Sequence, residues 1–171
     1  MESFEAKPVS DNILSKEQFD EIFNCLSSLV EKVSLSAVLL VNSTGHILSH
    51  RIEKNIPVDP SVLASLIAGS FSASTETARL LGEQSHFKML LHEGESQSML
   101  ISAVSSDFFL VVIFESAVAL GMIRLFTKRT IEQLIPILAR ENNPSDIDNI
   151  FNKRFQSLLG EELDRTLTEI S

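Results

Sequence analysis

Cysteine, glycine and long apolar runs are scarce in this chain of 171 residues, and these shortages exclude several classes of protein. The single cysteine, Cys25, rules out an internal disulfide framework and provides no metal-site spacing. No apolar run reaches the roughly 18 residues of a membrane span, so we expect no membrane insertion. The first residues lack the basic and then apolar layout of a signal peptide, which predicts a cytoplasmic location.

Basic residues are outnumbered, with 14 Lys and Arg against 23 Asp and Glu and a formal net charge of -9 at pH 7. This balance argues against binding of nucleic acid, or of an anionic membrane surface, through bulk electrostatics. Most of the negative excess lies before residue 36 and after residue 139. We therefore predict a compact domain over residues 16–139, a flexible N-terminal arm over residues 1–15 and a C-terminal helical extension over residues 144–171.

The sequence contains no recognisable motif for catalysis or cofactor binding. It has neither a G-x-x-x-x-G-K-[ST] loop nor a G-x-G-x-x-G loop, and six glycines leave little for a phosphate cradle. His46 and His50 would lie roughly 13 Å apart along a strand, too far to share one ion, and His86 and His92 would be further apart. We expect no metal, no cofactor and no active site, and we interpret Cys25 as a buried structural thiol.

Hydrophobic periodicity predicts an α+β protein with the order helix, two strands, helix, three strands, helix. Strands are expected at residues 37–41, 46–52, 86–92, 97–104 and 108–114, and helices at about 15–33, at about 60–81 and from about 118. The strands at 37–41 and 108–114 are apolar throughout and must be covered on both faces. They are therefore predicted as neighbours at the centre of a five-stranded antiparallel sheet.

The first and third helices each carry a local signal. The first helix opens on a capping box and has an apolar stripe, predicted to be buried, made of Phe19, Ile22, Phe23, Leu26, Leu29, Val30 and Val33. In the third helix, Pro136 removes one backbone donor and should kink or end the helix.

The second helix is unusual because few of its residues are charged. One half, predicted to face the sheet, contains Val62, Leu63, Leu66, Ile67, Phe71, Ala78, Leu80 and Leu81. The other half is small rather than charged, with Ala64, Ser65, Ala68, Gly69, Ser72, Thr75, Glu76 and Arg79. Solvated helix faces usually prefer Lys and Glu, which are better helix formers than Gly or Ser. The small half therefore favours close contact with another helix, and a weak surface helix is the alternative.

Three stretches of the chain resemble the Roadblock/dynein light-chain family, and within it the bacterial MglB-like regulators of small Ras-like GTPases. They are Ala37-Val-Leu-Leu-Val-Asn-Ser-Thr-Gly-His-Ile-Leu-Ser49, the Ala- and Ser-rich helix between Asp59 and Gly82, and Leu120-Gly-Met-Ile-Arg124. The resemblance covers about residues 16–139. It implies a sheet of order 2-1-5-4-3 with one helix on one face and two on the other.

The resemblance also implies a homodimer or heterodimer, in which the second helix packs against its mate and the third strand pairs edge to edge. The interface would then include Ala64, Ser65, Ala68, Gly69, Ser72, Glu76, Phe87, Lys88 and Met89. In MglB-like members the dimer binds a small Ras-like GTPase and promotes GTP hydrolysis or nucleotide exchange. A dimeric adaptor that docks a polarity or motility scaffold without acting on nucleotide is the second hypothesis. A PAS-like ligand sensor with a cavity near the sheet is the third.

Overall fold

The computed structural model describes residues 14–53, 57, 59–84 and 86–140. The helical extension predicted for residues 144–171 and nearly all of the predicted arm lie outside these residues. The described elements are α1 (Lys16–Lys32), β1 (Ala37–Asn42), β2 (Ile47–Ile52), α2 (Pro60–Leu80), β3 (Met89–His92), β4 (Gln97–Ala103), β5 (Phe108–Glu115) and α3 (Leu120–Leu138).

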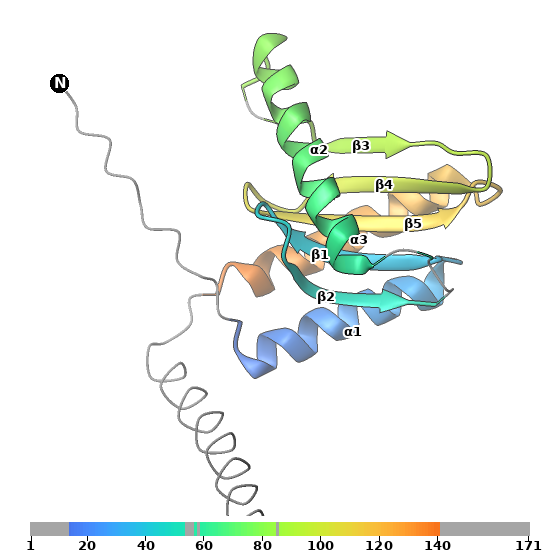
Figure 1. The fold of residues 1–171 in the computed structure, drawn as a ribbon. Coiled ribbons are helices and arrows are strands. Elements are labelled where there is room, and N and C mark those ends of the chain that lie inside the picture. Colours follow the sequence, from blue (N-terminus) through green and yellow to red (C-terminus); the bar gives the residue numbers. More distant parts are fainter. Residues whose placement is uncertain (1–13, 54–56, 58, 85, 141–171) are drawn as a thin grey trace, which may run out of the picture. The chain divides into compact units, whose positions relative to one another are not determined.

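The described strands form one sheet in the order β2-β1-β5-β4-β3, with every neighbouring pair antiparallel (Figure 1). The two apolar strands, β1 and β5, are neighbours at the centre, and all of β1 pairs with residues 108–113 of β5. All of β5 except its last residue is buried, as a strand covered on both faces must be. The predicted fold class and strand order are confirmed.

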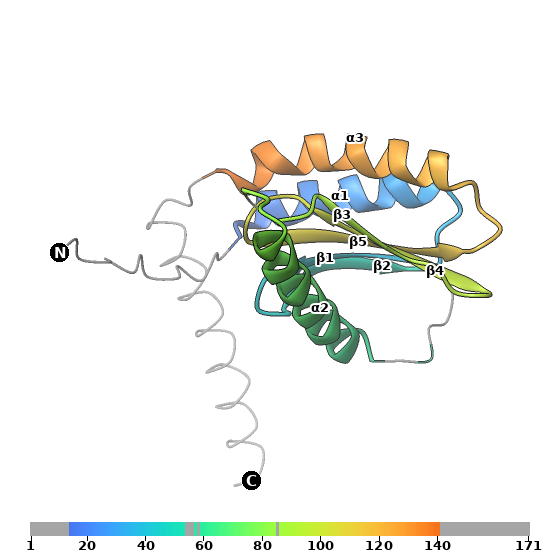
Figure 2. The ribbon, with the colours of Figure 1, turned by 90° about the horizontal axis from the view of Figure 1, so that it is seen from above.

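The helices form two layers on the sheet, with α1 and α3 side by side on one face and α2 on the other (Figure 2). Polar contacts join α1 to the end of α3. The buried Gln18 amide donates to the carbonyl of Ile137 at 2.9 Å and to that of Arg140 at 3.3 Å. Arg140 also forms an ion pair with Glu21, donating through Nη1 to Oε1 at 2.8 Å and through Nη2 to Oε2.

Local chemistry fixes both ends of α2. The Asp59 carboxylate caps the N-terminus by accepting from the Ser61 amide at 2.7 Å, and Pro60 fits the first turn, where its missing N–H is not needed. At the other end Gly82 has φ +81°, the left-handed conformation that commonly follows a helix. The Glu83 amide then donates back to the Ala78 carbonyl at 3.0 Å.

Three details differ from the sequence predictions. Strand β3 begins at Met89 rather than at residue 86, because the His86 ring packs on Phe71 of α2 with centroids 5.6 Å apart and strand pairing starts only beyond it. Phe19 and Phe23 of α1, predicted to be buried, are 45% and 39% exposed beside the β2 edge. Helix α3 continues for two residues past Pro136 and ends at Leu138, since the proline removes only one hydrogen bond, close to the end of the helix.

Candidate functional site

The outer surface of α2 carries four large apolar side chains in contact with solvent. Val62, Leu66, Leu80 and Leu81 are 52%, 66%, 76% and 71% exposed. Ser65 and the charged Arg79 are also exposed on this helix, and the other exposed residues between the four are mostly small or short: Gly69, Ser72, Ala73, Glu76 and Thr77. We call these last five residues, together with the four apolar ones, the α2 outer face. Exposed apolar side chains gathered along one helix face make this surface a candidate for contact with a partner.

Two residues of α2 face the side opposite to the one predicted from the sequence. Ala64 and Ala68, predicted on the contact face, are 0% and 7% exposed and belong to the core between α2 and the sheet. Their small side chains let α2 approach the sheet closely, while Ile67 and Phe71 fill the remaining space. Phe71 packs on Phe109 of β5 with ring centroids 4.2 Å apart. A contact between α2 helices must therefore use Val62 and Leu66 in place of the two alanines.

The other predicted members of the contact face on α2 are exposed. Gly69 has no atom within 4 Å of where a Cβ would lie, so its surface is open to another chain. Ser72 and Glu76 are exposed as well, and Glu76 accepts from Arg79 at 2.9 Å within the same helix. Ser65 is exposed but packs against Gly45 in the turn after β1. Their role in an interface remains a prediction.

Strand β3 forms one edge of the described sheet (Figure 1). The Lys88 carbonyl accepts from the Ala103 amide at 3.1 Å, so residue 88 directs its backbone groups toward β4. Because alternate residues of a strand point to opposite neighbours, Met89 and Leu91 direct theirs away from the sheet. Phe87 and Met89 are half-buried and Lys88 is exposed. This edge offers free backbone groups to a further strand.

The described residues contain no group of three or more His, Cys, Asp and Glu side chains that could hold a metal ion. Cys25 is half-buried, and burial raises the pKa of its thiol above 9.0. The negative charge of Glu21 raises this pKa further, and Lys32 opposes the effect more weakly. A thiol with a raised pKa is a poor nucleophile at neutral pH. None of the described helices is both long enough and apolar enough to span a membrane.

The sheet order and the helix layers, together with the exposed α2 outer face and β3 edge, are those of the Roadblock class of fold. The model of the Roadblock/LC7 domain family matches residues 25–114, and the chain belongs to this family. Within the family it is MglB-like. Myxococcus xanthus MglB is 30% identical, with a TM-score of 0.69, over 77% of this chain and 99% of that one. The gliding protein MglB from Thermus thermophilus is 27% identical, with a TM-score of 0.68, over 73% and 93%.

Two further proteins are similar to most of this chain. A structure described as MglB with a tetrameric arrangement is 26% identical, with a TM-score of 0.69, over 73% of this chain and 93% of that chain. An uncharacterized protein of Aquifex aeolicus is 24% identical over 163 residues, which cover 93% of this chain and 96% of the relative. The family match and the MglB neighbours support a regulator or adaptor class.

Proposed function

We propose that the protein is a dimeric, non-catalytic regulator that binds a small Ras-like GTPase and modulates its GTP hydrolysis or nucleotide exchange. Membership of the Roadblock/LC7 family and the similarity to MglB proteins support this proposal. The family match also favours it over a PAS-like ligand sensor. The observation that carries the proposal is the α2 outer face, which needs a partner surface.

A second copy of the chain suits this surface. In a two-fold dimer the same patch is used on both subunits, so the α2 outer face would meet its own copy. Leu66 and Val62 would then leave water, and Gly69 would allow the two backbones to approach. The β3 edge would pair with the β3 edge of the mate, which removes an exposed strand edge that otherwise invites aggregation. The α2 outer face and the β3 edge thus serve one interface.

The GTPase part of the proposal is tested by mixing the full-length protein with a Ras-like GTPase from the same organism. We expect a complex in gel filtration, and a change in either GTP turnover or the release of a fluorescent guanine nucleotide. A complex without any effect on the nucleotide favours the adaptor. The absence of both a complex and an effect contradicts the regulator.

An adaptor that docks a polarity or motility scaffold is the second candidate. It is favoured by exposed apolar side chains away from α2, such as Met122 and Leu125 of α3, which are 49% and 46% exposed. Deleting residues 144–171 separates the two candidates. Loss of scaffold binding with unchanged GTPase effects supports a docking role for this segment, and the reverse outcome supports the regulator.

A further inference from the structure

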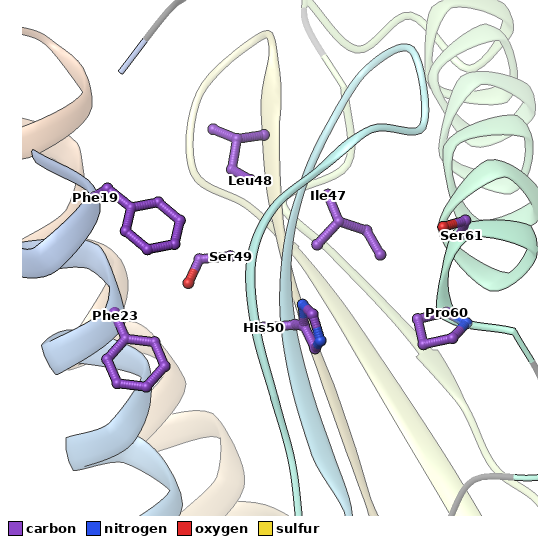
Figure 3. A pocket seen from close by; sticks show the side chains of 8 residues that line it. All are labelled: Phe19, Phe23, Ile47, Leu48, Ser49, His50, Pro60 and Ser61. Carbon is purple, nitrogen blue, oxygen red and sulfur yellow. The ribbon is translucent and has the colours of Figure 1, made fainter. Parts of the chain in front are cut away.

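An open pocket of about 540 Å³ lies at the β2 edge, at the end of the sheet opposite β3 (Figures 1 and 3). Its volume falls in the range of roughly 300–1,000 Å³ that is typical of ligand sites. Three elements contribute to it: α1, β2 and the first turn of α2. The lining residues are Phe19, Phe23, Ile47, Leu48, Ser49, His50, Pro60 and Ser61.

The pocket extends around both sides of the edge strand. Ser49 is paired with Leu40, and His50 with Leu39, which belongs to the core beneath α2. Because successive strand residues point to opposite faces, Ser49 faces the α1 side and His50 the α2 side. Figure 3 shows Ser49 directed toward Phe19 and Phe23, and His50 on the side of Pro60. An occupant that fills both halves must pass along the strand edge itself.

The backbone of β2 offers hydrogen bonds along this edge. The Glu53 amide donates to the Ser36 carbonyl of the neighbouring segment at 3.1 Å, so residue 53 faces β1. By alternation His50 and Ile52 direct their N–H and C=O groups away from β1. A bulge between Leu40 and Val41 places Leu48 out of register, and this restricts further pairing to residues 49–52.

One buried polar side chain in the pocket, Ser49, lacks a hydrogen-bond partner among the described residues. Ser49 is 4% exposed, and the atom concerned is its Oγ. This oxygen is shielded from solvent and lies on the side of Phe19 and Phe23 (Figure 3), so an occupant reaches it only by displacing part of the surrounding side chains. A buried hydroxyl without a partner is costly, and an incoming donor or acceptor would remove that cost.

The charged groups around the pocket limit which kinds of side chain can bind in it. Apart from His50, no lining residue is ionisable. The Arg51 guanidinium lies 5.5 Å from the centre of the Phe23 ring but is already paired with Glu53 at 2.7 Å and donates to Ser27 at 2.9 Å. A charged side chain would lose water here without gaining a counter-ion, so the pocket matches uncharged groups.

We propose that the β2 edge binds an extended, uncharged segment of a partner protein as an added strand, with one bulky side chain on each side of β2. The side chain between Phe19 and Phe23 is tyrosine or tryptophan, whose O–H or N–H bonds to the Ser49 Oγ. This mode combines main-chain pairing with side-chain pockets. It differs from the proposed dimer contact, which uses the β3 edge and the α2 outer face.

The proposal is tested by selecting peptides from a random twelve-residue library on the full-length protein, with counter-selection on Phe19→Asp. We expect peptides with tyrosine or tryptophan in an alternating apolar pattern, which lose at least about tenfold in affinity on Phe19→Asp. Ile135→Asp changes an apolar residue of nearly equal exposure on α3, 47% against 45% for Phe19, and should leave the affinity unchanged. Light scattering and circular dichroism check that both variants keep the mass and helicity of the parent chain.

Variants at two positions, His50 and Ser49, test the contacts. His50→Pro removes one outward N–H without touching the β1 ladder, and we expect it to abolish binding. His50→Ala keeps this N–H and loses only the side-chain contact, so it should weaken binding much less. Ser49→Ala should weaken peptides with tyrosine by about two- to tenfold and leave their phenylalanine analogues unchanged. We also expect the bound peptide to slow hydrogen exchange at the His50 and Ile52 amides. Failure to enrich peptides, protection elsewhere, or binding of small apolar fragments alone would overturn the proposal.

Discussion

Gly45, in the turn between β1 and β2, lies directly against the backbone of Ser65 in α2. A Cβ on Gly45 would lie 2.9 Å from the Ser65 Cα and 3.3 Å from its Oγ. Gly45 also has φ +86°, a conformation that L side chains rarely adopt. This contact fixes the first half of α2 against the sheet and thereby orients the α2 outer face toward solvent.

Gly45→Ala should destabilise the protein by about 2–4 kcal/mol, because strain at positive φ adds to overpacking against a backbone atom. Gly82→Ala is the matched control, since Gly82 has nearly the same φ of +81° but no atom within 4 Å of a Cβ. It should cost only about 1–2 kcal/mol. Urea unfolding measures both values. Equal losses in the two variants would show that the contact with Ser65 contributes nothing.

Gly69→Leu should convert the dimer to a monomer at micromolar concentration, because the branched side chain would separate the packed α2 helices. The monomer itself should stay folded, since the position is open and leucine is the better helix former. Gly121→Leu places the same side chain at an open position on α3 and should remain dimeric. Light scattering gives the masses. A dimeric Gly69→Leu protein would remove the α2 outer face from the interface.

The Glu21 carboxyl should titrate below 4.5, because its hydrogen bond with Arg140 lowers its pKa. The contribution of this pair to stability is present above the ordinary pKa and is lost as the pH falls through the lowered one. Carboxyl ¹³C NMR of the wild type and of Arg140→Gln measures the change. We expect the midpoint to return toward 4.5 in the variant, and an unchanged midpoint would refute the pairing in solution.

Cys25 should react slowly with iodoacetamide at pH 8, because burial raises the pKa of its thiol above 9.0. The rate should increase as the pH rises through and beyond this value. The same chain in urea supplies the reference rate for an exposed thiol, which should be clearly faster at pH 8. Equal rates in the folded and unfolded chain would contradict the half-buried position.

The sequence predicted the sheet because burial leaves a clear pattern there. The unbroken apolar runs of β1 and β5 identified the central pair, and the less apolar strands β2 and β3 fell at the edges. Helix α2 was less tractable, since apolarity alone does not say which side faces the sheet. Ala64 is buried and Leu66 exposed because close packing on the sheet requires a small side chain, which is a property of the assembled layers.

The β2 pocket also could not be predicted from the sequence. Phe19 and Phe23 follow the same helical spacing as the buried Ile22 and Leu26, and only the width of the sheet decides which of them extend past its edge. The small stripe of α2 did indicate an interaction surface, and part of that stripe, including Gly69, Ser72 and Glu76, is exposed.

The most direct test of the proposed function is the nucleotide cycle of a Ras-like GTPase from the same organism. GTP turnover and nucleotide release are measured for the GTPase alone, for the GTPase with the wild-type protein, and for the GTPase with the Gly69→Leu variant. The account predicts that the wild type binds the GTPase and changes one of the two rates, and that the Gly69→Leu variant does not. Unchanged rates with saturating wild-type dimer would contradict it.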